Sequence, residues 1–363
     1  MQDRAAIATA EELLHAAVAR RVFPAAVAEV GTHEGLIWRR AFGTRTFDEH
    51  ARPAELDTIF DLASLTKPIA TTSVVLTLLH AGALGLDDRV SDLVPEWAGA
   101  DRVPATIRML LEHSSGLAAR LLDQPPPDRR GFEHEIGALP LEYPCGTRSI
   151  YSDLGFILLG FCVEQRGRGS LAEQTRAALG PLFSSGAETQ LGDPLLVAVP
   201  PELRQRTAPT LPLPDDHRRG RQLVGEVHDD YAAALGGFAG HAGLFGTAAG
   251  VGGFGRVILC AARGDTSMPT PFTPSVVRNA MTRSAVARSS RALGWDTMLP
   301  TSSCGTRLST EAVGHTGFTG TSLWIDPVRD RYFVLLTNRV CGGGTTEQMQ
   351  HVRRAFHDAL ATI

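Results

Sequence analysis

Ser64 and Lys67 form an S-x-x-K pattern whose residue types and spacing suit nucleophilic chemistry. Three residues of separation bring a serine hydroxyl and a lysine amine to one face of a helix, within hydrogen-bonding reach. Lysine can lose its proton when it is desolvated or lies beside another cation, whereas arginine stays protonated. A helix N-terminus adds positive potential and free N–H groups. The pair therefore predicts a serine nucleophile with an amine beside it.

Lys67 is also the only lysine in the chain, because the other 34 of the 35 basic residues are arginines. Drift in a chain that otherwise uses arginine would explain one surviving lysine. A serine three residues before that lysine favours a role in the chemistry instead.

Two further motifs carry groups that could take part in catalysis. Tyr151-Ser152-Asp153 follows a turn at residues 143–146, and His315-Thr316-Gly317 precedes a predicted strand. A phenol beside an ammonium group can have its pKa lowered and act as a base, although a tyrosine before a helix is also common as a packed aromatic. A glycine-flanked edge strand can line a cleft. Each motif is weak alone, so their joint occurrence matters.

In this order and spacing, the three motifs resemble the serine β-lactamase and penicillin-binding-protein superfamily over about residues 10–360. The class C branch and its family VIII esterase and peptidase relatives are the most similar. The supporting stretches are residues 60–67 (FDLASLTK), 110–117 (LLEHSSGL), 151–156 (YSDLGF), 225–230 (GEVHDD), 235–245 (LGGFAGHAGLF) and 335–340 (LLTNRV). The last three resemble a bacterial cell-wall subgroup that includes cytosolic N-acetylmuramyl-L-alanine amidases.

The resemblance implies a mechanism through an acyl-enzyme formed on Ser64. Lys67 and Tyr151 would share the proton transfers, and which of them is the base stays open because the pair titrates as a coupled unit. The N–H groups of Ser64 and Phe318 would form the oxyanion hole. The other substrate-binding residues that the resemblance implies are Asp153, His315, Thr316 and Gly317.

Three positions depart from the family pattern. Asp153 stands where the family has Asn; it only accepts hydrogen bonds and adds a negative charge, so it should keep Lys67 protonated and shift the base role toward Tyr151. His315 replaces a lysine and is neutral for much of the time near pH 7, so strong β-lactamase activity is not expected. Tyr231 stands where the subgroup tends to have Asn.

The periodicity predicts strands near both ends of the chain and helices in between. Strands are expected at residues 25–31, 36–42, 322–325 and 332–337, and helices at the N-terminus and at residues 64–80, 107–112, 154–165, 171–179 and 347–360. The expected fold is α+β (mixed α/β) and β-lactamase/DD-peptidase-like, with an antiparallel sheet flanked by the terminal helices. Residues 1–66 and 235–363 should form the sheet domain and residues 67–234 an inserted, mostly helical domain, with the site between them.

Other readings compete with the serine hydrolase. Residues 250–255 match G-x-G-x-x-G, which would suggest a dinucleotide site, but a chain with 37 glycines produces such matches easily. His228, Asp229 and His241 could ligate a metal, but their spacing favours a hydrogen-bonded loop. A catalytically inactive peptidoglycan-binding protein on this fold has no need of Ser64, Lys67 and Tyr151 together.

Composition limits the remaining classes. No apolar run is long enough to span a membrane, and the net charge of −4 with scattered arginines argues against a nucleic-acid partner. Five cysteines, an odd number, and no evident export signal suggest the cytoplasm, or the periplasm if a signal peptide has been removed. We expect a serine hydrolase that cleaves an ester or amide, with cell-wall muramyl peptides as candidate substrates and no cofactor. A small-ester carboxylesterase and a DD-peptidase or weak β-lactamase are the alternatives; the sequence indicates no oligomeric state.

Overall fold

The computed structural model describes residues 2–121, 124–183, 195–265 and 270–363. Its strands are β1 (Ala25–Gly31), β2 (Leu36–Gly43), β3 (Phe60–Asp61), β4 (Phe245–Gly246), β5 (Asp296–Thr297), β6 (Val313–Thr316), β7 (Ser322–Asp326) and β8 (Arg331–Thr337). Its α-helices are α1 (Gln2–Ala19), α2 (Ser73–His80), α3 (Ile107–Leu111), α4 (Arg129–Ala138), α5 (Asp153–Arg166), α6 (Leu171–Ala178), α7 (Gly180–Phe183), α8 (Asp230–Ala234), α9 (Ala248–Arg263), α10 (Pro274–Met281) and α11 (Thr346–Leu360).

Strands from both ends of the chain form one antiparallel sheet, in the order β2-β1-β8-β7-β6-β5. The N-terminal strand β1 lies between β2 and the C-terminal strand β8, so the sheet is complete only when strands from both ends of the chain pair. This confirms the predicted mixed α/β fold. The domain boundaries at residues 66/67 and 234/235 stay a prediction.

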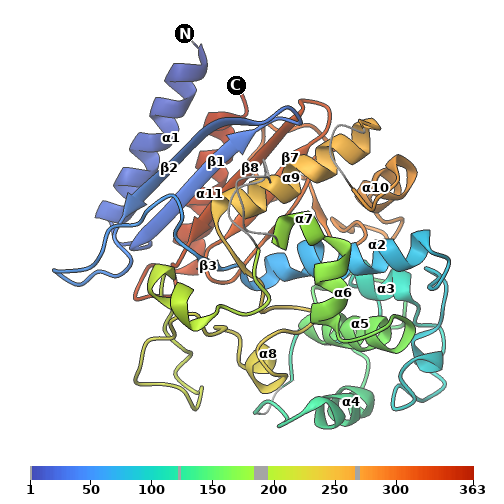
Figure 1. The fold of residues 1–363 in the computed structure, drawn as a ribbon. Coiled ribbons are helices and arrows are strands. Elements are labelled where there is room, and N and C mark those ends of the chain that lie inside the picture. Colours follow the sequence, from blue (N-terminus) through green and yellow to red (C-terminus); the bar gives the residue numbers. More distant parts are fainter. Residues whose placement is uncertain (1, 122–123, 184–194, 266–269) are drawn as a thin grey trace.

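Helices cover both faces of this sheet (Figure 1). On one face, α1 and α11 contact each other and enclose alternate side chains of β1, such as Ala28 and Val30. On the other face, α9 packs against β8 and β1 and belongs with Val27 to the larger core. Because β1 is buried on both faces, it reads as an almost continuous apolar run.

The glycine-rich run at residues 250–255 lies inside helix α9, not in a loop that could hold a pyrophosphate. A Cβ at Gly252 would lie 1.9 Å from Glu29 Oε1, and one at Gly255 would lie 3.0 Å from Tyr332 Cβ. These glycines therefore let the helix approach the sheet closely. The dinucleotide interpretation of the motif is not supported.

The segment predicted as one helix over residues 64–80 consists of three kinds of helix. A 3-10 turn at Ala63–Leu65 precedes a π-helix at Lys67–Thr72, which continues into α2. Pro68 lies in the first turn of the π-helix, where its missing N–H does no harm. Wide π turns of this kind are frequent at functional sites.

The second cluster of helices, α2 to α6, lies below the sheet in Figure 1. Its centre is α5, buried on all sides from Asp153 to Val163. Ser152 caps this helix by accepting a hydrogen bond from the Gly155 N–H, which fixes the direction of the Tyr151-Ser152-Asp153 segment. None of the helices in the described part of the chain has both the length and the apolar character that a membrane-spanning helix needs.

Candidate active site

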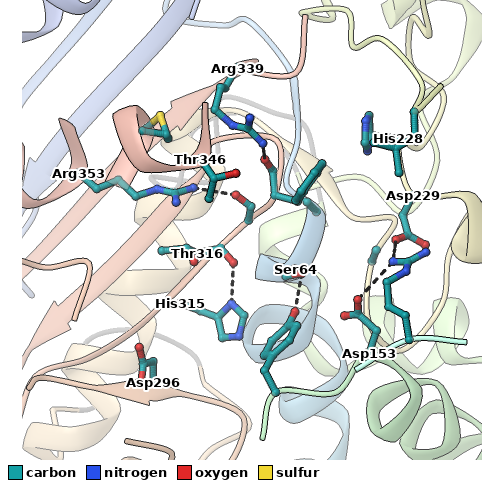
Figure 2. A pocket seen from close by; sticks show the side chains of 18 of the residues that line it. Ser64, Asp153, His228, Asp229, Asp296, His315, Thr316, Arg339, Thr346 and Arg353 are labelled. Atoms are coloured by element: carbon teal, nitrogen blue, oxygen red, sulfur yellow. Dashed lines mark hydrogen bonds and ion pairs between the residues drawn. The ribbon is translucent and has the colours of Figure 1, made fainter. Parts of the chain in front are cut away.

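A cavity of about 410 Å³ lies where the sheet meets the helical cluster (Figure 2). It is lined by seven of the eight site residues expected from the sequence: Ser64, Tyr151, Asp153, His315, Thr316, Gly317 and Phe318. Lys67 lies behind Ser64, with no exposed surface. The fold thus brings together three motifs that are far apart in the sequence.

Ser64 Oγ lies within hydrogen-bonding distance of both expected proton carriers. Lys67 Nζ donates to it over 3.1 Å, and the Tyr151 hydroxyl donates to it over 2.8 Å. The three-residue spacing of the S-x-x-K motif therefore produces the predicted serine–lysine contact. Tyr151 reaches the same oxygen from the residue before the cap of α5.

Lys67 is a fully satisfied ammonium group. Besides Ser64, it donates to Asp153 Oδ1 over 2.7 Å and to the backbone oxygen of His241 over 3.0 Å. Burial opposes the charged form, but Asp153 and Tyr151 outweigh it, and the net effect is a raised pKa of Lys67. This agrees with the expectation that Asp153 keeps Lys67 protonated.

The expectation of a lowered pKa for Tyr151 is wrong in its net direction. Burial and the negative charge of Asp153 raise the pKa of Tyr151, and the opposing effect of Lys67 is smaller. The family's Asn would lack that charge, so the departure at Asp153 affects both neighbours of Ser64. In the resting site, the serine, phenol and ammonium all carry their protons.

A network of charges lies behind Asp153. Arg120 bridges three carboxylates, at 3.3 Å from Asp153, 2.9 Å from Asp229 and 2.5 Å from Asp230. The guanidinium stacks over the ring of Tyr231, with its Cζ 3.8 Å from the ring centroid. Tyr231, the third residue that departs from the family pattern, thus supports Arg120. Arg120 in turn contacts Asp153 Oδ2, whereas Lys67 contacts Asp153 Oδ1.

His228, Asp229 and His241, which were considered as metal ligands, lie in the loops on either side of helix α8 and do not converge on one point. His241 Nε2 and Asp229 Oδ1 lie 2.7 Å apart, while the ring of His228 packs against Phe318 at 5.5 Å. Within the described residues, no group of three or more His, Cys, Asp or Glu side chains is arranged to hold a metal ion. The hydrogen-bonded loop is the better description.

The H-T-G motif forms the opposite wall, at the end of β6. Burial, together with Lys67 and Arg291, lowers the pKa of His315 well below its ordinary value, so this imidazole is neutral. Gly317 is required because a Cβ there would lie 2.1 Å from Thr321 Oγ1 and 2.6 Å from the Leu62 oxygen. The turn can therefore lie directly against the strand that leads to Ser64.

Two arginines hold this turn from outside. Arg353 on α11 donates to the carbonyl oxygens of Gly317 and Thr321, and Arg339 donates to that of Phe318. With these carbonyls engaged, the turn that carries the Phe318 N–H is fixed relative to Ser64.

Sequence reasoning assigned no role in the site to three residues that the structure places there. His113 accepts a hydrogen bond from the Ser152 N–H, and its ring packs against Tyr151 at 4.8 Å. Arg291 lies with its Cζ 5.4 Å from the centre of the Tyr151 ring and pairs with no carboxylate in the described part of the chain. Arg120 follows the LLEHSSGL stretch by three residues, which was the only local signal for it.

Comparisons with known proteins identify the family to which this chain belongs. The Beta-lactamase family profile matches residues 10–355. A protein of Escherichia coli (strain K12) named "Putative D-alanyl-D-alanine carboxypeptidase" is 32% identical over 341 residues, which cover 84% of this chain and 76% of that protein. A protein of the same name from Salmonella agona is 28% identical, with 83% and 74% covered.

Solved structures share the fold at lower sequence identity. EstCE1, a hydrolase with promiscuous acyltransferase activity, superposes with a TM-score of 0.76 at 20% identity, covering 99% of each chain. A class C β-lactamase from Rhodobacter sphaeroides gives a TM-score of 0.74 at 19% identity, covering 97% of this chain and 98% of that one. With the profile spanning nearly the whole sequence, the chain belongs to the β-lactamase family and is a serine hydrolase of that fold.

Proposed function

We propose that the protein cleaves ester or amide bonds through an acyl-enzyme formed on Ser64. The observation that carries this proposal is the pair of hydrogen bonds that Ser64 Oγ accepts, from Lys67 at 3.1 Å and from Tyr151 at 2.8 Å. A hydroxyl between two groups that can exchange protons is the arrangement that activated serine nucleophiles use.

Proton transfer begins when the pair flanking Ser64 has lost one proton. The deprotonated member accepts the Ser64 proton as Oγ attacks the substrate carbonyl, and it returns that proton to the leaving alcohol or amine. Water then attacks the acyl-enzyme by the same route, which releases the acid and restores Ser64. Tyr151 is the favoured base, because Asp153 stabilises the Lys67 ammonium directly at 2.7 Å.

The oxyanion would be bound by the N–H groups of Ser64 and Phe318. Ser64 lies in the first turn of a 3-10 helix, where N–H groups have no partner within the helix. Phe318 follows Gly317, whose missing side chain allows the turn to approach the residues before Ser64. Asp153, Thr316 and His315 then line the substrate-binding space.

The substrate class that we favour is a short peptide or acyl amino acid with a free carboxylate. Arg291 faces the cavity without a carboxylate partner among the described residues, so it can pair with an anionic group of a substrate. The carboxypeptidase name of the Escherichia coli relative is compatible with such a substrate. Cell-wall muropeptides fit this description, and the odd number of cysteines, five, favours a reducing, cytoplasmic compartment for them.

A small-ester carboxylesterase is the second candidate. Phe318 is 51% exposed and Leu213 is 38% exposed, and both line the cavity as an apolar rim. A rim of this kind suits an apolar acyl or alcohol group.

Labelling with a fluorophosphonate tests the nucleophile. Wild-type protein should bind one equivalent covalently, and the Ser64→Ala variant should bind none, because the variant lacks the attacking oxygen. Ser170→Ala is the matched control, since that hydroxyl caps α6 and contacts Glu173 outside the cavity and should leave labelling intact. Labelling that persists in Ser64→Ala would show that another residue is the nucleophile. A panel of p-nitrophenyl acetate, nitrocefin and D-alanyl-D-alanine-terminated peptides then chooses among the substrate classes.

A further inference from the structure

The residue before Ser64 has an unusual backbone conformation. Ala63 has a φ of 49°, in the left-handed region that non-glycine residues seldom occupy. Such a conformation is unfavourable for a residue with a Cβ and persists only where surrounding contacts enforce it. Because the backbone of Ala63 sets the direction of the Ser64 side chain, the contacts that enforce this conformation also position the serine.

Asp61 supplies the contacts that enforce this turn. Its Oδ1 accepts a hydrogen bond from the Ala63 N–H over 2.8 Å, and its Oδ2 accepts one from the His228 N–H over 2.6 Å. Its backbone oxygen accepts a third, from Thr319 Oγ1 over 2.8 Å. One residue thus ties together the turn before Ser64, the loop that carries Asp229, and the turn that follows Phe318.

The carboxylate is buried and has no ion-pair partner in the described part of the chain. Asp61 is 2% exposed, and the two N–H groups are its direct stabilising contacts. The charged groups that act on it from the packed loops are Arg218, which favours the ionised form, and Asp229, which opposes it. Burial raises the pKa of Asp61 to about 6.

We propose that Asp61 is a positioning residue for the nucleophile, whose ionised carboxylate holds the Ala63–Ser64 turn against the walls of the active site. The proposal rests on the proposed role of Ser64. A carboxylate accepts at both oxygens, so both N–H groups are bound at once. When Asp61 is protonated, one oxygen carries a hydrogen and becomes a poorer acceptor, so the hydrogen bond from one of the two N–H groups weakens.

This arrangement gives the enzyme an activity that depends on the charge of Asp61. Above pH 6 the carboxylate holds both loops and Ser64 keeps its position. Below pH 6 the protonated side chain holds one loop less firmly, and the serine is less well aligned. Displacement of a reacting group by about 1 Å can cost about 100-fold in rate. The histidines His113, His228 and His315 all have pKa values lowered by burial, so their titration falls further into acid.

The test compares wild type with Asp61→Asn in the hydrolysis of p-nitrophenyl acetate from pH 4.5 to 10. Asn accepts one N–H through its oxygen but presents an amide N–H to the other. We expect kcat at pH 7.5 to fall on the order of 10- to 100-fold while KM changes less than about threefold. The inflection near pH 6 should also disappear, because the variant stays neutral throughout. Wild-type kcat in Asp61→Asn, or an inflection near pH 6 that remains in this variant, would contradict the proposal.

A matched control separates positioning from stability. Glu29 is another buried carboxylate with a pKa raised by burial, but it lies on β1 against Tyr332, away from the cavity. Glu29→Gln should keep the inflection near pH 6 even if its melting temperature changes. If Asp61→Asn does not fold, the wild-type profile decides, since the proposal requires an inflection near pH 6 in a protein that circular dichroism shows to be folded. Fluorophosphonate labelling tests the nucleophile separately. If Ser64→Ala loses labelling and Asp61→Asn keeps it, Ser64 remains the proposed nucleophile even if the proposal for Asp61 fails.

Discussion

Asp153 controls the charge state of both groups that flank Ser64. It lies 2.7 Å from Lys67 Nζ, and it raises the pKa of Lys67 and of Tyr151 alike. The deprotonated form of either group is therefore scarce at neutral pH. If the base has a raised pKa, the reaction rate increases with pH until the base is fully deprotonated.

The Asp153→Asn substitution should move this alkaline limb to lower pH. Removing the negative charge lowers both pKa values, so the active form is populated at a lower pH. The measurement is the pH dependence of kcat/KM for p-nitrophenyl acetate between pH 6 and 10. Asp230→Asn is the control, because Asp230 contacts Arg120 but not Lys67. An unmoved limb in Asp153→Asn would mean that Asp153 does not set the protonation of the pair.

At the scale of secondary structure, regular hydrophobic patterns were predicted well. Strands β1, β7 and β8 and helices α5 and α11 lie within one or two residues of their expected positions. Helix α9 was missed because its glycines have low helix propensity, and only its packing against Glu29 and Tyr332 explains them. Helix α4 was hidden by the prolines before it, although Asp128 caps it.

The same contrast holds for the site. Ser64, Lys67 and Tyr151 could be predicted because each belongs to a short motif with its own spacing. Arg120, Arg291 and His113 could not, since their partners lie on other segments and only the tertiary fold joins them. The pKa of Tyr151 was misjudged for the same reason, as burial is not visible in the sequence.

The glycine at position 252 gives a prediction about helix α9. Gly252→Ala should lower the free energy of unfolding by about 1–3 kcal/mol, because the new methyl group would overlap Glu29 Oε1. Gly155→Ala in α5 is the control: its Cβ would meet neighbours at 3.7 Å and 3.8 Å, so the gain in helix propensity should leave stability equal or higher. Urea denaturation measures both. Equal stability of Gly252→Ala and wild type would show that α9 can move off the sheet at little cost.

At the scale of the whole molecule, charge is divided between the two walls of the cavity. Figure 2 shows Asp153 and Asp229 on one side of Ser64 and the arginines Arg339 and Arg353 on the other, where the neutral His315 and the carboxylate of Asp296 also lie. Arg339 and Arg353 donate to backbone carbonyls, so no carboxylate of the described chain neutralises them. A substrate with its carboxylate toward the arginine wall would match this field.

We expect Arg291 to determine substrate specificity by pairing with the carboxylate of the substrate. Arg291→Gln is expected to lower kcat/KM about tenfold for a D-alanyl-D-alanine-terminated peptide, because a charge-assisted hydrogen bond is lost. The rate with neutral p-nitrophenyl acetate should change little. The comparison of the two substrates at low and high salt measures the effect. An equal loss for both would show that Arg291 supports Tyr151 and does not bind the substrate.

The burial of the only lysine has a consequence for chemical probes of this protein. Lys67 has no exposed surface and all three of its N–H groups are engaged. An acylating reagent specific for amines therefore finds no accessible lysine side chain on the folded chain. Modification of Lys67 requires the active site to open, so its rate under native conditions reports the free energy of that opening at one defined atom. The chain thus contains its own single-site reporter of local unfolding at the catalytic centre.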